Sequence, residues 1–196
     1  MNYAAVVLAA GSARRFGSDK MSALFKGEPL VSHAIRAARA APASRVVVVA
    51  HPALAIEPQA GVEIVRIASP ALSESLRVGL DAAGKVDGLF VFLGDMPLVP
   101  HDAASRLAER IGDAYAAMPC HAGKPGHPVL LSRRALADIA TLRGDAGAGK
   151  LLRARDDVVF DECSDPLIHA DVDHPQDLSA LTKAGDTPST SPEPKT

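Results

Sequence analysis

The stretch NYAAVVLAAGSARRFGSDK, residues 2–20, decides the fold because it joins an apolar run directly to a basic turn. A near-continuous apolar run such as residues 2–10 is typical of a strand that is covered on both faces of a sheet. Gly11 and Gly17 then allow the backbone to approach a ligand closely. Positive charge follows in three side chains of the same turn: Arg14, Arg15 and Lys20.

This basic turn predicts a binding site for a polyphosphate. Backbone amides form a concave anion site, and the cationic side chains neutralise the phosphate charge. Neither the G-x-G-x-x-G fingerprint of dinucleotide-binding folds nor the G-x-x-x-x-G-K-(S/T) motif of P-loops occurs in this turn. The alternative interpretation is an exposed basic turn without a ligand, since such turns are common on protein surfaces.

The first half of the chain alternates between strand-like and helix-like segments. Strands are predicted at 45–51, 62–67 and 87–95, and helices at 29–41, 73–84 and 101–112. This alternation indicates an α/β domain with a mostly parallel sheet. Right-handed crossovers place the carboxyl ends of parallel strands at one edge, which is where such folds bind ligands.

The second half of the chain is less regular and is expected to add antiparallel strands. Strands are predicted at 114–119, 127–132, 157–162 and 167–173, and helices at 133–141, 147–154 and from Pro175 onward. Residues 1–182 are expected to form a single domain. Residues 183–196 are rich in Pro, Ser and Thr and carry no large apolar side chain, so we expect a disordered tail.

Composition excludes several classes of protein. The 196 residues suit one domain, and 47% hydrophobic residues suffice for a sizeable core. A formal net charge of −2 provides no global basic field for nucleic acid. Two cysteines, Cys120 and Cys163, are expected to be reduced thiols. No apolar run reaches the ~18 residues of a membrane span and no signal-peptide pattern occurs, so a cytoplasmic location is expected.

The segment LGDMP, residues 93–97, places an acid directly after a strongly apolar strand. Asp95 therefore lies at the same sheet edge as the basic turn. Mg²⁺ prefers few protein carboxylates together with phosphate oxygens of the substrate. Asp95 is accordingly the predicted first metal ligand, and an Asp that caps a turn at the strand end is the alternative.

The segment HADVDHPQDL, residues 169–178, offers a second carboxylate. Asp171 and Asp173 alternate with apolar residues, so both project to one side of an extended segment. Either could be the second metal ligand, and an N-cap role for Asp173 before Pro175 is the alternative. No histidine or cysteine cluster has the spacing of a structural zinc site, which disfavours zinc.

Five segments, in order, resemble the molybdenum cofactor nucleotidyltransferases. LAAGSARRFGSDK is similar to the family signature L-A-(A/G)-G-x-S-x-R-x-G-x-x-K, and LGDMP is similar to its metal-aspartate motif. The other three are GHPVLL (126–131), GDAGAGKLL (144–152) and DVDHPQDL (171–178), which resemble G-(N/H)-P-V, G-D-x-G-A-R-x-L-L and D-(I/V)-D-T-P-E-D-L. The likeness spans residues 4 to about 182.

The resemblance implies a Rossmann-like three-layer α/β/α fold with the nucleotide at the sheet edge. Family members transfer a nucleotide monophosphate from an NTP to the phosphate of a molybdopterin-type cofactor, and the A-A-G form of the first loop implies CTP. Maturation of a xanthine dehydrogenase-type or carbon monoxide dehydrogenase-type apoenzyme is then expected. The nucleotide-binding residues implied are Leu8, Ala9, Ala10, Gly11, Arg15, Lys20, Ser75, Gly94 and Asp95.

The resemblance also assigns roles to individual residues. Arg15 and Lys20 are expected to contact the triphosphate, with Asp95 as the third catalytic residue. Mg²⁺ is expected on Asp95 and Asp173. His127 and Asp145 are expected on the acceptor side, although each also suits a plain turn. Ser73 is predicted to cap the helix that carries Ser75, and a capped helix without a ligand is the alternative for that segment.

Two positions depart from the family pattern, and they put single roles in doubt. Ala13 stands where the family has serine, with Ser12 beside it. Gly149 stands where the family has arginine, with Lys150 next, so position 149 lacks the side chain that the family pattern has there.

Three other functions compete with cytidylyl transfer. Guanylyl transfer to the same cofactor and nucleotidyl transfer to another acceptor, such as a sugar phosphate, would use the same first loop and metal aspartate. A non-catalytic chaperone that holds the cofactor is the alternative of another class. Such a carrier has no need of two carboxylates beside the cationic turn.

Overall fold

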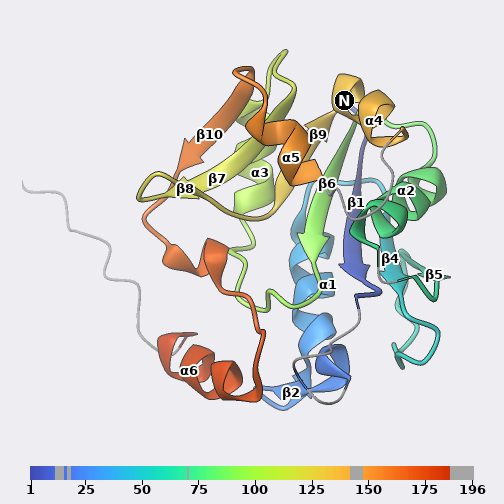
Figure 1. Cartoon of the computed structure of the whole chain (residues 1–196), viewed down its shortest axis with the longest axis vertical. Coiled ribbons are helices and arrows are strands. Elements are labelled where there is room, and N and C mark those ends of the chain that lie inside the picture. The colour runs from blue at the N-terminus through green and yellow to red at the C-terminus, as the bar shows by residue number, and fades with distance from the viewer. Residues whose placement is uncertain (12–15, 17–18, 70, 142–147, 186–196) are drawn as a thin grey trace, which may run out of the picture.

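The computed structural model describes residues 1–11, 16, 19–69, 71–141 and 148–185. A mixed sheet forms the centre, and helices cover both of its faces (Figure 1). The predicted α/β class with a mostly parallel sheet is therefore confirmed. In the described part of the chain, no helix has both the length and the apolar character that crossing a bilayer requires.

The strands follow the order β10-β7-β9-β6-β1-β4-β5, and β8 pairs with β7 at the side. Their bounds are β1 (Tyr3–Ala9), β4 (Val46–Ala50), β5 (Val62–Arg66), β6 (Gly88–Leu93), β7 (Ala116–His121), β8 (Lys124–Pro125), β9 (Val129–Ser132) and β10 (Val158–Glu162). β9 runs antiparallel to both β6 and β7, whereas the β1–β4, β1–β6, β4–β5 and β7–β10 pairs are parallel. The predicted antiparallel additions in the second half are thus confirmed.

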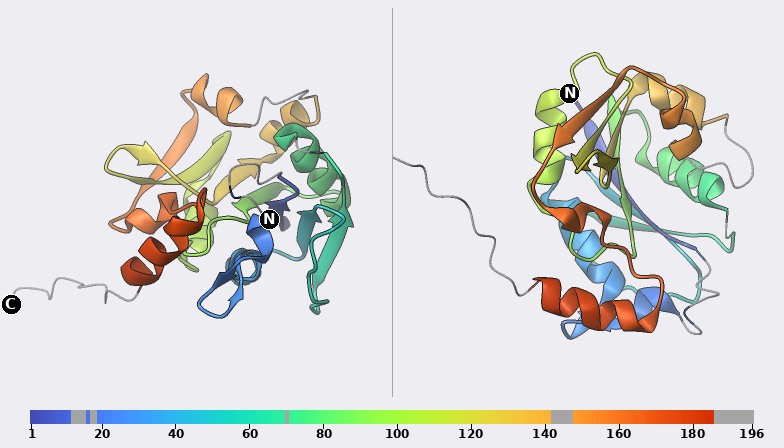
Figure 2. Two further views of the ribbon diagram at one scale, coloured as in Figure 1. Left: turned by 60° about the horizontal axis from the view of Figure 1, so that its bottom comes forward. Right: turned by 60° about the vertical axis from the view of Figure 1, so that its left-hand side comes forward.

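The helices divide between the two faces of the sheet (Figure 2). α1 (Leu30–Ala40) and α3 (Ala103–Arg110) pack on one face, and α2 (Leu72–Ala83), α4 (Arg133–Ile139) and α5 (Ala148–Arg153) pack on the other. β1 shows why its sequence is apolar at every position. Its odd-numbered residues join the core under α1, and its even-numbered residues join the core under α2.

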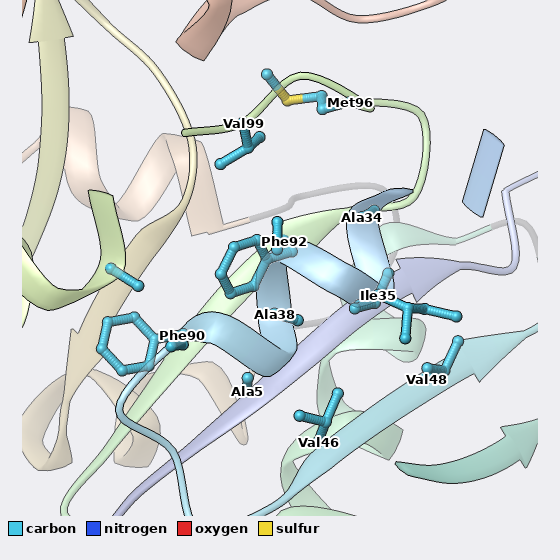
Figure 3. Close-up of a cluster of buried hydrophobic side chains, with 14 of the residues drawn as sticks. Ala5, Ala34, Ile35, Ala38, Val46, Val48, Phe90, Phe92, Met96 and Val99 are labelled. Atoms are coloured by element: carbon cyan, nitrogen blue, oxygen red, sulfur yellow. The ribbon is translucent and has the colours of Figure 1, made fainter. Parts of the chain in front are cut away.

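Aromatic and small side chains interlock in the core under α1. Phe90 and Phe92 of β6 lie beside Ala34, Ile35 and Ala38 of α1 in Figure 3. Phe90 and Ile35 are fully buried. The alanines on α1 leave room for the aromatic rings of β6, so the helix packs closely against the sheet.

A smaller cluster lies beyond the carboxyl ends of β1 and β6, toward which their arrowheads point in Figure 1. It joins the 3₁₀ helix η1 (Lys20–Ser22), the hairpin of β2 (Leu24–Phe25) and β3 (Glu28–Pro29), and α6 (Pro175–Gly185). We call it the satellite core; its buried members are Phe16, Phe25, Leu30 and Val172, and Leu178 and Leu181 of α6 pack against them.

Two predictions about local structure need correction. Residues 167–173 do not form a strand: Pro166–His169 is the 3₁₀ helix η2, and 170–173 are extended without a strand partner. Asp165 favours that helix, because its carboxylate accepts a hydrogen bond from the Leu167 amide at 2.9 Å. Ser73 does not cap α2, because the helix already begins at Leu72 with Ala71 as its cap residue.

α6 runs through Gly185, three residues into the segment predicted as a disordered tail. The remaining tail residues, 186–196, lie outside the described residues.

Gly79 tests the packing of α2 against the sheet. A Cβ at Gly79 would overlap Val6 Cγ2 and lie 3.1 Å from Val49 Cγ2. We expect Gly79→Ala to lower the free energy of unfolding by about 1–3 kcal/mol in urea titrations, because overpacking a core outweighs the better helix propensity of Ala. Gly149→Ala is the matched control, since its Cβ would meet only the flexible end of Arg153. An unchanged midpoint for Gly79→Ala would contradict this packing.

Candidate active site

The site begins where β1 and β6 end side by side. The Gly94 amide donates to the Leu8 carbonyl at 2.9 Å and so continues the pairing of the two strands. A Cβ at Gly94 would lie 3.0 Å from both Ala9 Cβ and Met21 Sδ. Glycine is therefore required for the close approach of this turn, which delivers Asp95 to the strand end.

Lys20 brings the basic turn to Asp95. The Asp19 carboxylate accepts a hydrogen bond from the Met21 amide at 3.2 Å and caps η1, which fixes the direction of the next side chain. Lys20 is only 9% exposed, although lysine is rarely buried without a partner. Its Nζ donates to Asp95 Oδ2 at 2.8 Å, across 75 residues of chain.

The second predicted carboxylate reaches the same ammonium. Lys20 Nζ lies 3.4 Å from Asp173 Oδ1, across 153 residues of chain. The Asp95 side chain is 21% exposed and that of Asp173 is 52% exposed, so solvent reaches these two carboxylates mainly on the Asp173 side. We call these three residues the Lys20 cluster.

The charges of the Lys20 cluster leave room for a further cation. One ammonium faces two carboxylates, so the cluster carries an excess of negative charge. Within the described residues, no group of three or more His, Cys, Asp or Glu side chains is placed to hold a metal ion. Two carboxylates nevertheless fit Mg²⁺ or Mn²⁺, because such ions take their other ligands from water and substrate phosphates.

Val172 fixes the approach of Asp173. Its amide donates to the Asp95 carbonyl at 3.0 Å, which ties the segment before α6 to the turn after β6. Its side chain is fully buried in the satellite core, while Asp171 and Asp173 on either side are exposed. The alternation of an extended chain thus turns the valine inward and both acids outward.

Asp177 holds the backbone at Asp173 from the other side. Its carboxylate accepts from the amides of Asp173 at 2.9 Å and His174 at 2.7 Å, as an acid in the first turn of a helix does in a capping box. These two amides lower the pKa of Asp177. The carboxylate of Asp173 is directed to Lys20 rather than to a helix amide, so Asp173 and not Asp171 faces the ammonium.

His127 lies at the same edge, just before β9. The backbone of η2 passes close to Gly126 of the preceding turn, since a Cβ on Gly126 would lie 2.6 Å from the Ile168 carbonyl oxygen. The His127 Nδ1 is buried and has no hydrogen-bond partner. Burial lowers the pKa of His127 below its ordinary 6.5, while the Val91 carbonyl and the charges of Asp95 and Asp171 act in the opposite direction. The ring of His127 is therefore held neutral at a place where the charges of Asp95 and Asp171 act on it.

The other predicted residues fall into three groups: residues at the end of β1, a serine on α2, and residues outside the described part of the chain. Leu8, Ala9 and Ala10 are buried at the end of β1, and Gly11 follows them as an exposed residue. Ser75 is buried on α2, where its hydroxyl donates to the Ala71 carbonyl at 3.3 Å. Arg15 and Asp145, together with Ser12, Ala13, Arg14 and Gly17, lie outside the described residues.

Sequence reasoning missed the residues that support the site. Val172 and the β2–β3 hairpin were not predicted, and neither was the burial of Phe16 at 9% exposure within the basic turn. A signal for Val172 was present, because an apolar residue between two acids in an extended segment must face away from them. No comparable sequence pattern indicated where η1 and the β2–β3 hairpin lie.

Comparison with known proteins places the chain in a family of transferases. Residues 5–158 match the MobA-like NTP transferase domain. A search of curated proteins found no match.

Solved structures share the fold over nearly the whole chain. The homologue of Mycobacterium tuberculosis Rv0371c from Mycobacterium sp. strain JC1 is 28% identical, with a TM-score of 0.82 over 93% of this chain and 96% of that one. Rv0371c from M. tuberculosis H37Rv, in complex with manganese, is 25% identical, with a TM-score of 0.81 over 94% and 100%. A nucleotidyl transferase from Methanothermobacter thermautotroptrophicus, at 21% identity and TM-score 0.76 over 93% and 97%, shows the fold alone.

Val172 provides a test of the satellite core. We expect Val172→Ala to lower the free energy of unfolding by about 2 kcal/mol, because the lost methyl groups leave a cavity among buried side chains. The neighbouring Asp171→Ala, at an exposed position, should change it by less than about 0.5 kcal/mol. Urea unfolding of both variants makes the comparison, and equal effects would show that Val172 does not anchor this segment.

Proposed function

Because the chain belongs to the MobA-like NTP transferase domain family, we propose that it transfers CMP from CTP to the phosphate of a molybdenum-molybdopterin cofactor. Nucleotidyl transfer in general is supported by the family. The choice of nucleotide and acceptor rests on the resemblance of the five sequence segments. The observation that carries the proposal is the convergence of Lys20, Asp95 and Asp173 from three distant parts of the chain.

Nucleotidyl transfer to a phosphate requires charge neutralisation and alignment of the two substrates rather than general acid–base catalysis. An oxygen of the acceptor phosphate is already a nucleophile and forms a bond to the α-phosphorus of CTP. The bond from that phosphorus to the oxygen bridging to the β-phosphate breaks, and pyrophosphate leaves with the electron pair. Holding both phosphates at one place converts two diffusing partners into one oriented pair.

Lys20 is proposed to neutralise charge that builds up on the leaving pyrophosphate. Its ammonium is nearly buried, so its interaction with a phosphate oxygen is screened less by water than that of an exposed lysine. The two carboxylates hold the ammonium in the absence of substrate. We expect the ammonium to exchange one carboxylate for the triphosphate when CTP binds.

Asp95 and Asp173 are the residues proposed to hold Mg²⁺ or Mn²⁺. A bound divalent cation would supply charge neutralisation to the phosphates at this edge. The manganese complex of Rv0371c supports a divalent ion in a relative of the same fold. In this chain, the hydrogen bond from the Val172 amide to the Asp95 carbonyl ties the segment that carries Asp173 to the turn that carries Asp95.

The proposal of CTP rests on the A-A-G form of the first loop. Ala9 and Ala10, the small residues of that form, are 1% and 2% exposed, so their side chains belong to the core rather than to the loop surface. Gly11 follows, and a Cβ there would meet none of the described residues within 4 Å. At Gly11 the described part of the chain therefore leaves space for a ligand, as a site built on amide groups requires.

Removing either member of the ion pair should abolish most turnover. We expect Lys20→Ala and Asp95→Ala each to lower the rate of pyrophosphate release at least about 100-fold, as loss of one preorganised electrostatic contact does elsewhere. Lys85→Ala is the matched control, because Lys85 is an exposed lysine at the opposite end of β6. An Asp95→Ala variant that folds and keeps the normal rate would refute the assignment.

Nucleotide choice is tested by thermal stabilisation. With Mg²⁺ or Mn²⁺ present, CTP should raise the melting temperature, since a ligand at 100 times its Kd stabilises by about 2.7 kcal/mol. GTP and UTP should give clearly smaller shifts. A larger shift with GTP would replace cytidylyl by guanylyl transfer. Stabilisation by CTP without pyrophosphate release from CTP and the purified cofactor would favour a non-catalytic carrier.

A further inference from the structure

An apolar cleft lies on the α2 side of the sheet, and its lining includes Leu8 and Leu93 from the ends of β1 and β6. It consists of an inner chamber of about 200 Å³ and an outer chamber of about 380 Å³. Four residues line both chambers: Met118, His127, Gly149 and Leu152. The two chambers are therefore neighbours, and together they reach the size of a site for a small organic ligand.

The inner chamber begins at the strand ends that carry the proposed active site. Leu8 of β1 and Leu93 of β6 line it, and each lies within a few residues of the basic turn or Asp95. Leu72 and Leu76 of α2 form another part of its wall. Among the described residues of that wall, His127 alone carries a polar side chain, and its buried Nδ1 lacks a partner.

The outer chamber has a different character. Lys124 of β8 and Arg153 of α5 bring positive charge to it, and Phe160 of β10 adds an aromatic ring that is 49% exposed. The cleft thus changes from an apolar interior near the site of transfer to a cationic mouth. A ligand that fits both parts has a planar, weakly polar ring system and an anionic group at its far end.

Gly149 stands where the two chambers meet. Among the described residues, a Cβ at this position would approach only Arg153 Nη1, at 3.3 Å, and the backbone is not in the left-handed region. Neither packing against the described residues nor conformation therefore requires glycine here, and glycine is a poorer helix former than Ala. Gly149 is also the residue at which the GDAGAGKLL segment departs from the pattern that it otherwise resembles.

We propose that Gly149 is a specificity-determining residue for the acceptor: by lacking a side chain, it keeps the passage between the chambers open for a planar heterocyclic ring system. This inference deepens the proposed function and rests on it. The phosphate of the acceptor faces the Lys20 cluster, and the ring system lies in the cleft beside His127, with its far end toward the outer chamber that Lys124 and Arg153 line. His127 Nδ1 supplies a hydrogen-bonding atom that the protein itself leaves without a partner.

Placing a side chain at position 149 tests this proposal without disturbing the core. We expect Gly149→Leu to raise the KM for purified molybdenum-molybdopterin cofactor about 10-fold or more, as an obstructed ligand pocket does. The KM for CTP should stay within about twofold of the wild type, because Lys20, Asp95 and Asp173, which are proposed to act on the triphosphate and its metal ion, do not line either chamber. The melting temperature should be equal or higher, since leucine is a better helix former than glycine.

Two further variants separate obstruction from a general effect on α5. Lys150→Leu places the same side chain at the neighbouring exposed position, and the KM for the cofactor should remain near the wild-type value. Gly149→Ala adds a single carbon beside the flexible end of Arg153 and should raise that KM less than Gly149→Leu does. An unchanged cofactor KM in Gly149→Leu, with turnover intact, overturns the proposal and leaves the proposed function standing.

A binding measurement distinguishes failure of the proposal from failure of the proposed function. If the wild type releases no pyrophosphate from CTP and the cofactor, the proposed function fails, and the cleft is then tested alone by fluorescence titration with pterin-6-carboxylate. Binding to the wild type that is lost in Gly149→Leu and kept in Lys150→Leu supports the open passage. Equal binding to all three proteins, or no binding to the wild type, overturns it.

Discussion

The shared ammonium of Lys20 is the interaction on which the site depends. Its positive charge contacts one carboxylate from the turn after β6 and another from the segment before α6, and it offsets the repulsion between them. The lysine is itself nearly buried. An ion pair with partners this far apart in the chain links the two ends of the fold at the edge where substrates are proposed to bind.

The satellite core gives this interaction its geometry. Phe16 from the basic turn, Phe25 from the hairpin and Val172 from the last segment are buried together, so three contributors to the site share one hydrophobic anchor. The Val172 amide is bonded to the Asp95 carbonyl, which joins the anchor to the sheet. Hydrophobic burial is not directional, whereas the hydrogen bond is, and the two together define where Asp173 stands.

The cleft beside His127 connects the chemistry of the site to the choice of acceptor. Transfer requires a phosphate at the Lys20 cluster, but that cluster does not distinguish one phosphate ester from another. Discrimination has to come from the walls that enclose the rest of the acceptor. In this chain those walls are aliphatic near the strand ends and cationic at the mouth, and they meet at a residue without a side chain.

The sequence by itself determined the α/β class and the strands of the first half, and it singled out Lys20 and Asp95 as candidate site residues, because apolar runs and charged residues that follow them are local signals. It left open whether Asp171 or Asp173 faces the lysine, and it predicted a strand at 167–173 where a 3₁₀ helix and an extended segment occur. Only the tertiary structure decided these points. The burial of Val172, its bond to Asp95 and the cleft at Gly149 all depend on contacts between segments far apart in the chain, and no local pattern encodes such contacts.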